Sequence, residues 1–419
     1  MSETKQTKTA KATLRAYAMI GVLAVIWIYF HYATNPSTPE YWHVLDHIKL
    51  FFAGFPAAVS NLFSSTHSPS WITDGIFLTP RNLSNLMTQM SVTAVLAVGM
   101  LMVIVSGSID LSVGSLLGLA GGVAAYSLSE YELGLPLSIA LAIITAVAIG
   151  VFQGALTAYL NIPSFIVTLG GLLAWRGAVK GLLGGNTVPI SNETYKDIGQ
   201  ANLPAEYGWL LAAIAVAFVF FMAFRRARSV KDYGLGNAPY GAEFVKSIVP
   251  VIGVIAFIWV MNDYNGVPVP VLILLGVALL GAFLTNSTVF GRYLYAIGGN
   301  AEAARLSGIN NKLNVLKVFA LLGALTGVAA LIFTARVGAA SPDAGTLKEL
   351  DAIAACVIGG ASLVGGRGTV FGACLGALIM ATLDNGMSLL NVRDFMQDIV
   401  KGSILVAAVG LDMIGRKQS

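Results

Sequence analysis

Apolar segments of about 20 residues follow one another along nearly the whole chain, and each is long enough to cross a bilayer as a helix. Of the 419 residues, 56% are hydrophobic and 11% are charged, whereas a soluble domain carries about 25% charged residues. We therefore predict an all-α fold, a polytopic transmembrane helical bundle formed by residues 1–419 as a single domain. We expect the 46 glycines to serve close helix packing and to interrupt some spans, which would then be discontinuous.

The pattern predicts about twelve spans. Pro163, Pro268 and Pro270 stand at or near predicted starts, where a missing backbone N–H costs least. The predicted spans are 14–32, 84–106, 111–128, 137–160, 164–184, 207–224, 246–262, 268–286, 313–337, 351–365, 370–390 and 395–412.

The distribution of Lys and Arg predicts the orientation. Most of the 25 basic residues fall in inner segments if the N-terminus is cytoplasmic. Both termini and the loop 287–312 are then cytoplasmic, and the polar, aromatic insertion 35–81 lies on the outer face. The net charge of +4 follows this topology and indicates no nucleic-acid partner. His43 and His47 in the insertion have i, i+4 spacing, but no carboxylate or cysteine completes a metal site nearby.

The loop 287–312 contains a short helix with its own start and stop signals. Asn300 is a suitable N-cap, Glu302 faces the positive end of the helix dipole, and Gly308 offers a left-handed stop. Two turns are not stable alone in water. The segment is therefore either a capped turn in a solvated loop or a docking site.

Polar residues near the predicted spans are candidates for a gate or pathway. Asp110 and Ser112 lie between two spans, Thr168 lies within a span, and Asp384 and Asn385 lie near an outer end. A charge at membrane depth must be capping, paired or wet. Each candidate also has a structural interpretation, as a helix cap, a turn or a close helix contact.

Glycines mark expected helix breaks in two similar segments. Both segments are rich in glycine and precede a G-x-x-x-G motif, GSLLG and GTVFG respectively, so they fit either a parallel repeat or a chance match. The break residues are Gly107, Gly114, Gly365 and Gly366.

Sequence motifs for chemistry are absent from the chain. There is no G-x-x-x-x-G-K-[ST] phosphate loop, no H-E-x-x-H, no G-x-S-x-G and no cysteine–histidine cluster. We therefore expect no catalytic residues, no enzyme activity, and neither a metal nor a cofactor on this chain.

Several segments resemble a known family. Glu302–Ala303–Ala304 followed by Gly308 resembles the EAA-x-x-x-G loop of ABC importer permeases, whose short helix docks on the ATPase subunit. Ser106–Ala125, Ile162–Gly177, Ala296–Asn310 and Leu350–Leu390 resemble the ribose/xylose/arabinose class of monosaccharide permeases. The insertion differs from what that class leads us to expect. The resemblance therefore does not indicate how the outer face is built or how a binding protein docks there.

The resemblance implies a permease subunit in a bacterial inner membrane that imports a pentose such as D-xylose. It also implies a second copy of the permease, a cytoplasmic ABC ATPase that holds ATP and Mg, and a periplasmic sugar-binding protein. The residues implied in ATPase coupling are Asn300, Glu302, Ala303, Ala304, Arg305 and Gly308.

Two other classes stay open at this point. A secondary transporter driven by an ion gradient would need a carrier group such as Asp110, Asp351 or Asp384. A membrane scaffold or receptor component would carry no solute at all.

Overall fold

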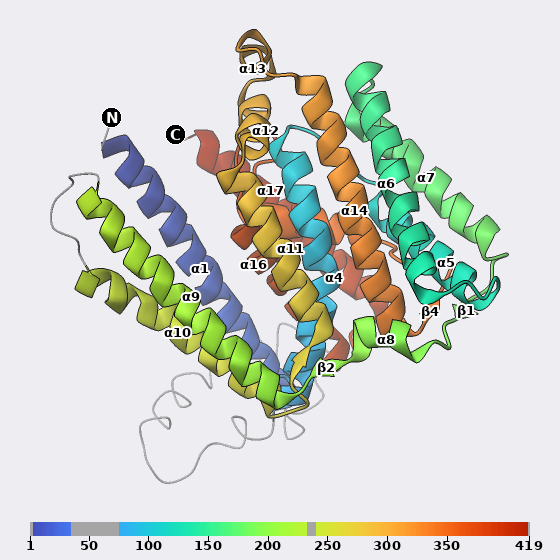
Figure 1. Cartoon of the computed structure of the whole chain (residues 1–419), viewed down its shortest axis with the longest axis horizontal. Helices are drawn as coiled ribbons and strands as arrows, with labels where there is room; N and C mark the ends of the chain where they lie inside the picture. The colour runs from blue at the N-terminus through green and yellow to red at the C-terminus, as the bar shows by residue number, and fades with distance from the viewer. Residues whose placement is uncertain (1–2, 35–74, 233–239, 418–419) are drawn as a thin grey trace.

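The protein is described from a computed structural model that covers residues 3–34, 75–232 and 240–417, and these residues are almost entirely helical (Figure 1). The first helices are α1 (Glu3–Ala33), α4 (Pro80–Val105), α5 (Val113–Ser129), α6 (Leu135–Tyr159), α7 (Ser164–Leu182), α8 (Glu193–Gln200), α9 (Ala205–Asp232) and α10 (Tyr240–Asn262). The later ones are α11 (Val269–Ser287), α12 (Val289–Gly299), α13 (Ala301–Leu306), α14 (Asn311–Val337), α15 (Lys348–Ile358), α16 (Val370–Leu389) and α17 (Asp394–Lys417).

Eight helices within the described ranges are long and apolar enough to cross a membrane: α4, α6, α7, α9, α10, α11, α14 and α16. The apolar parts of α1 and α5 are shorter. The predicted polytopic helical bundle is confirmed, and most predicted span boundaries fall within a few residues of the observed ones.

One predicted span is not a full-length helix. The segment 351–365 contains only the end of α15, which has 11 residues and is therefore about 16 Å long at 1.5 Å per residue. Irregular chain occupies residues 359–369 before α16 begins. Glycine explains the difference, because Gly360, Gly365 and Gly366 adopt the left-handed backbone that a helix excludes. This segment is thus one of the discontinuous spans that the glycine content predicted.

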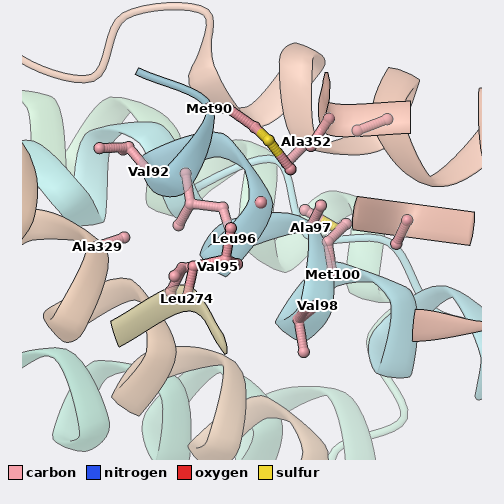
Figure 2. Close-up of a cluster of buried hydrophobic side chains, with 14 of the residues drawn as sticks. Met90, Val92, Val95, Leu96, Ala97, Val98, Met100, Leu274, Ala329 and Ala352 are labelled. Carbon is pink, nitrogen blue, oxygen red and sulfur yellow. The ribbon is translucent and has the colours of Figure 1, made fainter. Parts of the chain in front are cut away.

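Helix α4 lies at the centre of the bundle. It packs against α11, α14, α15 and α16, and 89% of its apolar window is buried. Figure 2 shows Val95, Leu96 and their neighbours on α4 beside Leu274 of α11, Ala329 of α14 and Ala352 of α15. A helix that is apolar on every side is expected at such a central position.

Close packing fixes α6 against α14. A Cβ on Gly150 would overlap the carbonyl oxygen of Phe319, and one on Gly323 would overlap that of Ala146. Glycine at i, i+4 spacing on both helices (Gly150 with Gly154, Gly323 with Gly327) brings the two backbones into contact, as in other membrane helix pairs.

The two ends of the bundle differ. Helix α13 and both termini lie at one end, which we call the α13 end (Figure 1). The opposite end carries α8 and two short antiparallel strand pairs, β1 (Val188–Pro189) with β4 (Ala339–Ala340) and β2 (Asn202–Leu203) with β3 (Val267–Pro268). Most of the predicted insertion, residues 35–74 with His43 and His47, lies outside the described residues.

Candidate functional site

The short helix α13 has the caps that its sequence predicts. The Asn300 side chain accepts a hydrogen bond from the Ala303 amide at 2.9 Å, and Gly308 has a φ of +83° just after the helix. Glu302 and Arg305 form an ion pair at 2.6 Å, with both side chains about two-thirds exposed. The hydrogen bond from Arg305, helped by its charge, lowers the pKa of the Glu302 carboxyl. Glu302 therefore stays ionised at neutral pH and the pair remains intact.

Helix α13 presents one face outward and one inward. Leu306 is 75% exposed, and Glu302 and Ala303 are exposed beside it. Ala304, in contrast, is only 4% exposed, so it supports the helix from below instead of lying on its outer surface. Leu306 was not among the predicted coupling residues, although an apolar residue inside a charged loop is a signal that the sequence contains.

Helix α12 joins α13 to the bundle and was not predicted. Leu294 and Ile297 are buried on its inner face, and Phe290 packs against the core beside them. The i, i+4, i+7 spacing of these three residues was the available signal. The Tyr295 hydroxyl also donates a hydrogen bond to the Gly368 carbonyl oxygen at 2.8 Å. The segment before α13 is therefore anchored to the chain that leads into α16.

Three of the four predicted break glycines meet a fourth glycine at the end of α12. A Cβ on Gly298 would overlap the Val105 carbonyl oxygen at the end of α4. A Cβ on Gly365 would lie 2.8 Å from the Gly298 oxygen and 3.1 Å from the Gly107 Cα. The Gly366 amide donates to the Val105 oxygen at 2.9 Å. We call Gly107, Gly298, Gly365 and Gly366 the glycine junction.

The glycine junction brings three separate segments into backbone contact directly behind α13. They are the loop after α4, the end of α12 and the irregular chain after α15. The contacts are close, since a Cβ on Gly298 or Gly365 would meet backbone atoms of a neighbouring segment, and one of them is a backbone hydrogen bond, so the three segments are linked directly through their backbones. The fourth predicted break glycine, Gly114, lies elsewhere, against the Gly345 carbonyl oxygen and the Glu349 carboxylate.

Three predicted pathway residues lie together around the loop that follows α4. The Asp110 carboxylate accepts hydrogen bonds from the Ser112 amide and hydroxyl, both at 2.7 Å. The Ser112 hydroxyl accepts from the Gln153 amide at 2.9 Å. The Thr168 hydroxyl on α7 reaches the same loop, since it lies 3.3 Å from the Ile109 carbonyl oxygen as a donor. Asp110 is 2% exposed, so these bonds hold a buried loop in place.

The other two pathway candidates lie toward the opposite end of the bundle. Asn385 and Asn82 exchange two side-chain hydrogen bonds, at 2.8 and 3.0 Å. This amide pair ties the start of α4 to the last part of α16. The structure therefore does not place Asp384 and Asn385 beside Asp110, Ser112 and Thr168.

Asp384 belongs to a cluster of four charges that the sequence did not reveal. Lys401 lies 2.7 Å from Asp384 and 3.9 Å from Asp351, and Lys348 lies 2.6 Å from Asp351 and 3.9 Å from Asp384. All four side chains are at most 23% exposed. We call these residues the charge network. It links α15, α16 and α17 with two positive and two negative groups.

Within residues 3–34, 75–232 and 240–417, no group of three or more His, Cys, Asp or Glu side chains is placed to hold a metal ion.

The match to a family profile defines the class of protein. The profile described as "Branched-chain amino acid transport system / permease component" matches residues 82–409, a span that includes the glycine junction, α13 and the charge network. The chain belongs to this family of transporter permeases.

Curated relatives give a narrower likeness. The chain is 48% identical over 353 residues to the xylose transport system permease protein XylH of Escherichia coli strain K12, covering 84% of this chain and 89% of that protein. It is 49% identical over 347 residues to XylH of Haemophilus influenzae, covering 83% and 92%. The ribose import permease protein RbsC of E. coli K12 is 37% identical over 350 residues, covering 83% and 88%. No solved structure gives a significant match.

Proposed function

We propose that this chain is the membrane permease of an ATP-driven importer for D-xylose or a similar pentose. The observation that carries the proposal is the near full-length similarity to permeases named for xylose transport. The helical bundle supports it, because the chain has membrane-spanning helices and lacks a phosphate-binding loop of its own. A separate subunit would then hold ATP and Mg and hydrolyse the nucleotide.

In this proposal α13 is the coupling helix that docks on the ATPase. The helix would lie on the cytoplasmic side of a bacterial inner membrane, with both termini on the same side. The exposed face with Glu302, Ala303 and Leu306 would meet the ATPase, while the bonds from Asn300 and the buried Ala304 keep the helix in position. The exposed Leu306 side chain lies beside the Glu302–Arg305 ion pair. Such a surface suits a groove on another protein, because a few side chains buried at an interface contribute most of the binding energy.

The glycine junction would transmit the movement of α13 into the membrane. Helix α12 connects α13 to Gly298, which lies against the chain ends of α4 and of the segment after α15. A displacement of α13 therefore changes the position of both loops. The complete importer would contain two permease copies, two ATPase subunits and a periplasmic sugar-binding protein docked at the opposite end.

The ion-driven alternative is not favoured by the geometry. Asp351 and Asp384 are each paired with lysine, whereas a carrier carboxylate must exchange its ion freely. Asp110 is held by two hydrogen bonds from Ser112.

Reconstitution tests the proposal. The tagged permease, its copurifying ATPase and a sugar-binding protein are placed in proteoliposomes, and uptake of labelled D-xylose is measured with and without ATP. We expect uptake to require ATP and the ATPase, and Glu302→Lys to abolish it while the protein still inserts. Uptake driven by an ion gradient without ATP would overturn the proposal, and a complex without any sugar flux would favour the scaffold reading.

A further inference from the structure

A cleft of about 480 Å³ opens where three loops converge near the glycine junction. Its walls come from the loop after α4, from the end of α6 with the turn into α7, and from the chain between α15 and α16. The volume falls in the range of small-molecule sites, about 300–1,000 Å³. The residues that line it include Gly107, Ser108, Thr157, Asn161, Phe165 and Leu363.

Three polar side chains in this cleft have no hydrogen-bond partner within the described parts of the chain. The Thr157 hydroxyl is shielded from water and unpaired. The Ser108 hydroxyl and the Asn161 amide line the cleft and form no side-chain bond there, although the backbone N–H groups of Ser108 and Ile162 are both satisfied. Polar side chains without protein partners, gathered in one cleft, suit a ligand that carries several hydroxyls.

Phe165 adds an apolar surface to the same cleft. Its side chain is half exposed, at 49%, and it lies at the start of α7 beside Ser164. A hydroxyl-rich sugar ring has polar edges and C–H faces, so it needs donors and acceptors around it and an aromatic surface beside it. The cleft provides both.

The geometry points to this cleft as a binding site for the transported monosaccharide on its way out at the α13 end. This inference rests on the proposed function and deepens it, because it gives the sugar its contacts: hydrogen bonds to Ser108, Thr157 and Asn161, and apolar contact with Phe165. The cleft also includes Gly107, which belongs to the glycine junction, and Leu363, which lies between α15 and that junction. Movement of α13 would therefore change the shape of the site and release the sugar.

Occupancy is tested directly by thiol protection in the reconstituted full complex. Ser108→Cys places a thiol in the cleft, and Ser307→Cys on the exposed side of α13 is the matched control. The wild-type chain, with Cys356 and Cys374, gives the background. We expect D-xylose to slow labelling of Ser108→Cys by a small thiol reagent at least about threefold without affecting Ser307→Cys. Equal rates at Ser108→Cys with and without sugar would overturn the site.

Side-chain contributions are tested by uptake at a saturating concentration of loaded sugar-binding protein. Thr157→Val keeps the shape and removes the hydroxyl, Asn161→Gly removes the amide and suits the positive φ of that position, and Phe165→Leu removes the ring. Each is expected to lower uptake about three- to tenfold, the effect of one lost hydrogen bond or apolar contact. Thr326→Val is the control, since that hydroxyl is bonded within α14, to the Leu322 carbonyl oxygen at 2.8 Å.

The two proposals fail in different ways. If the wild-type complex imports no sugar with ATP, the proposed function itself is wrong. If the wild type imports D-xylose, but the three cleft variants match Thr326→Val and sugar gives no protection at Ser108→Cys, only the cleft assignment is wrong.

Discussion

The two ends of the bundle are held together by different kinds of contact. At the α13 end, Gly107, Gly298, Gly365 and Gly366 place backbone directly against backbone. Toward the opposite end, the charge network and the Asn82–Asn385 pair join α4, α15, α16 and α17 through directed side-chain bonds. Directed polar bonds inside a membrane resist displacement, since a broken one leaves an unpaired group in an apolar surrounding.

In the proposed mechanism this difference decides where movement enters the molecule. The backbone contacts link three segments next to the helix that is proposed to receive the ATPase, so a displacement of that helix would reach all three. The bonded end would keep the spans in register while the other end moves. Variants at the α13 end should therefore change transport more than stability, and variants at the bonded end should do the reverse.

The largest effect is expected at Leu306. Leu306→Ser removes the exposed apolar knob without disturbing the Asn300 cap or the buried Ala304. If Leu306 is an anchor of the interface, ATP-driven uptake falls about 30-fold or more, because such anchors are worth about 2 kcal/mol. Leu306→Met, which keeps an apolar side chain of similar size, is the control. Normal uptake by the Leu306→Ser complex would contradict the proposal that α13 docks on the ATPase through Leu306.

Breaking the charge network should lower the stability of the folded protein. Lys401→Met leaves Asp384 with only the more distant Lys348, at 3.9 Å, and should destabilise the purified permease by about 2 kcal/mol. The measurement is the thermal unfolding midpoint in detergent. Adding Asp384→Leu should restore most of the loss, because Lys348 and Asp351 remain as a balanced pair. A double variant less stable than Lys401→Met would show that Lys348 and Asp351 do not form a stable pair without Asp384 and Lys401.

A smaller loss is expected at the amide pair. Asn385→Leu removes both bonds to Asn82 and leaves one buried amide partly unpaired, although Asn82 keeps its bond to the Phe77 carbonyl oxygen at 2.8 Å. We expect about 1–2 kcal/mol of destabilisation in the same assay. Uptake per folded molecule should be unchanged. A loss of uptake with unchanged stability would place this pair in the moving part of the protein.

Much of the fold could be predicted from the sequence because the membrane imposes simple rules. Apolar runs with Pro and Gly boundaries located α4, α6, α7, α11, α14 and α16 closely. The cap and stop of α13 were also readable, since Asn300 and Gly308 act on their own chain neighbours. Local rules therefore predicted the span boundaries and the ends of helix α13.

What the sequence could not supply depends on contacts between distant residues. Lys348 and Lys401 lie beside Asp351 and Asp384 only because the fold brings α15, α16 and α17 together. In the sequence, Gly298 is simply one of two adjacent glycines. Only the fold shows that it lies against Gly107 and Gly365. Pairings of that kind are set by tertiary packing, which local sequence patterns do not record.

In the proposed mechanism, the glycine junction transmits the action of the ATPase on α13 into the membrane. Gly298→Ala tests it most directly, because the added methyl would overlap the Val105 carbonyl oxygen. Gly299→Ala is the matched control, with no atom within 4 Å of the added methyl. The measurement is the number of sugar molecules imported per ATP hydrolysed in proteoliposomes, with thermal unfolding as the check on folding. We expect Gly298→Ala to retain ATP hydrolysis and to lose most of its import per ATP, while Gly299→Ala matches the wild type. An unchanged ratio in a folded Gly298→Ala complex would contradict it.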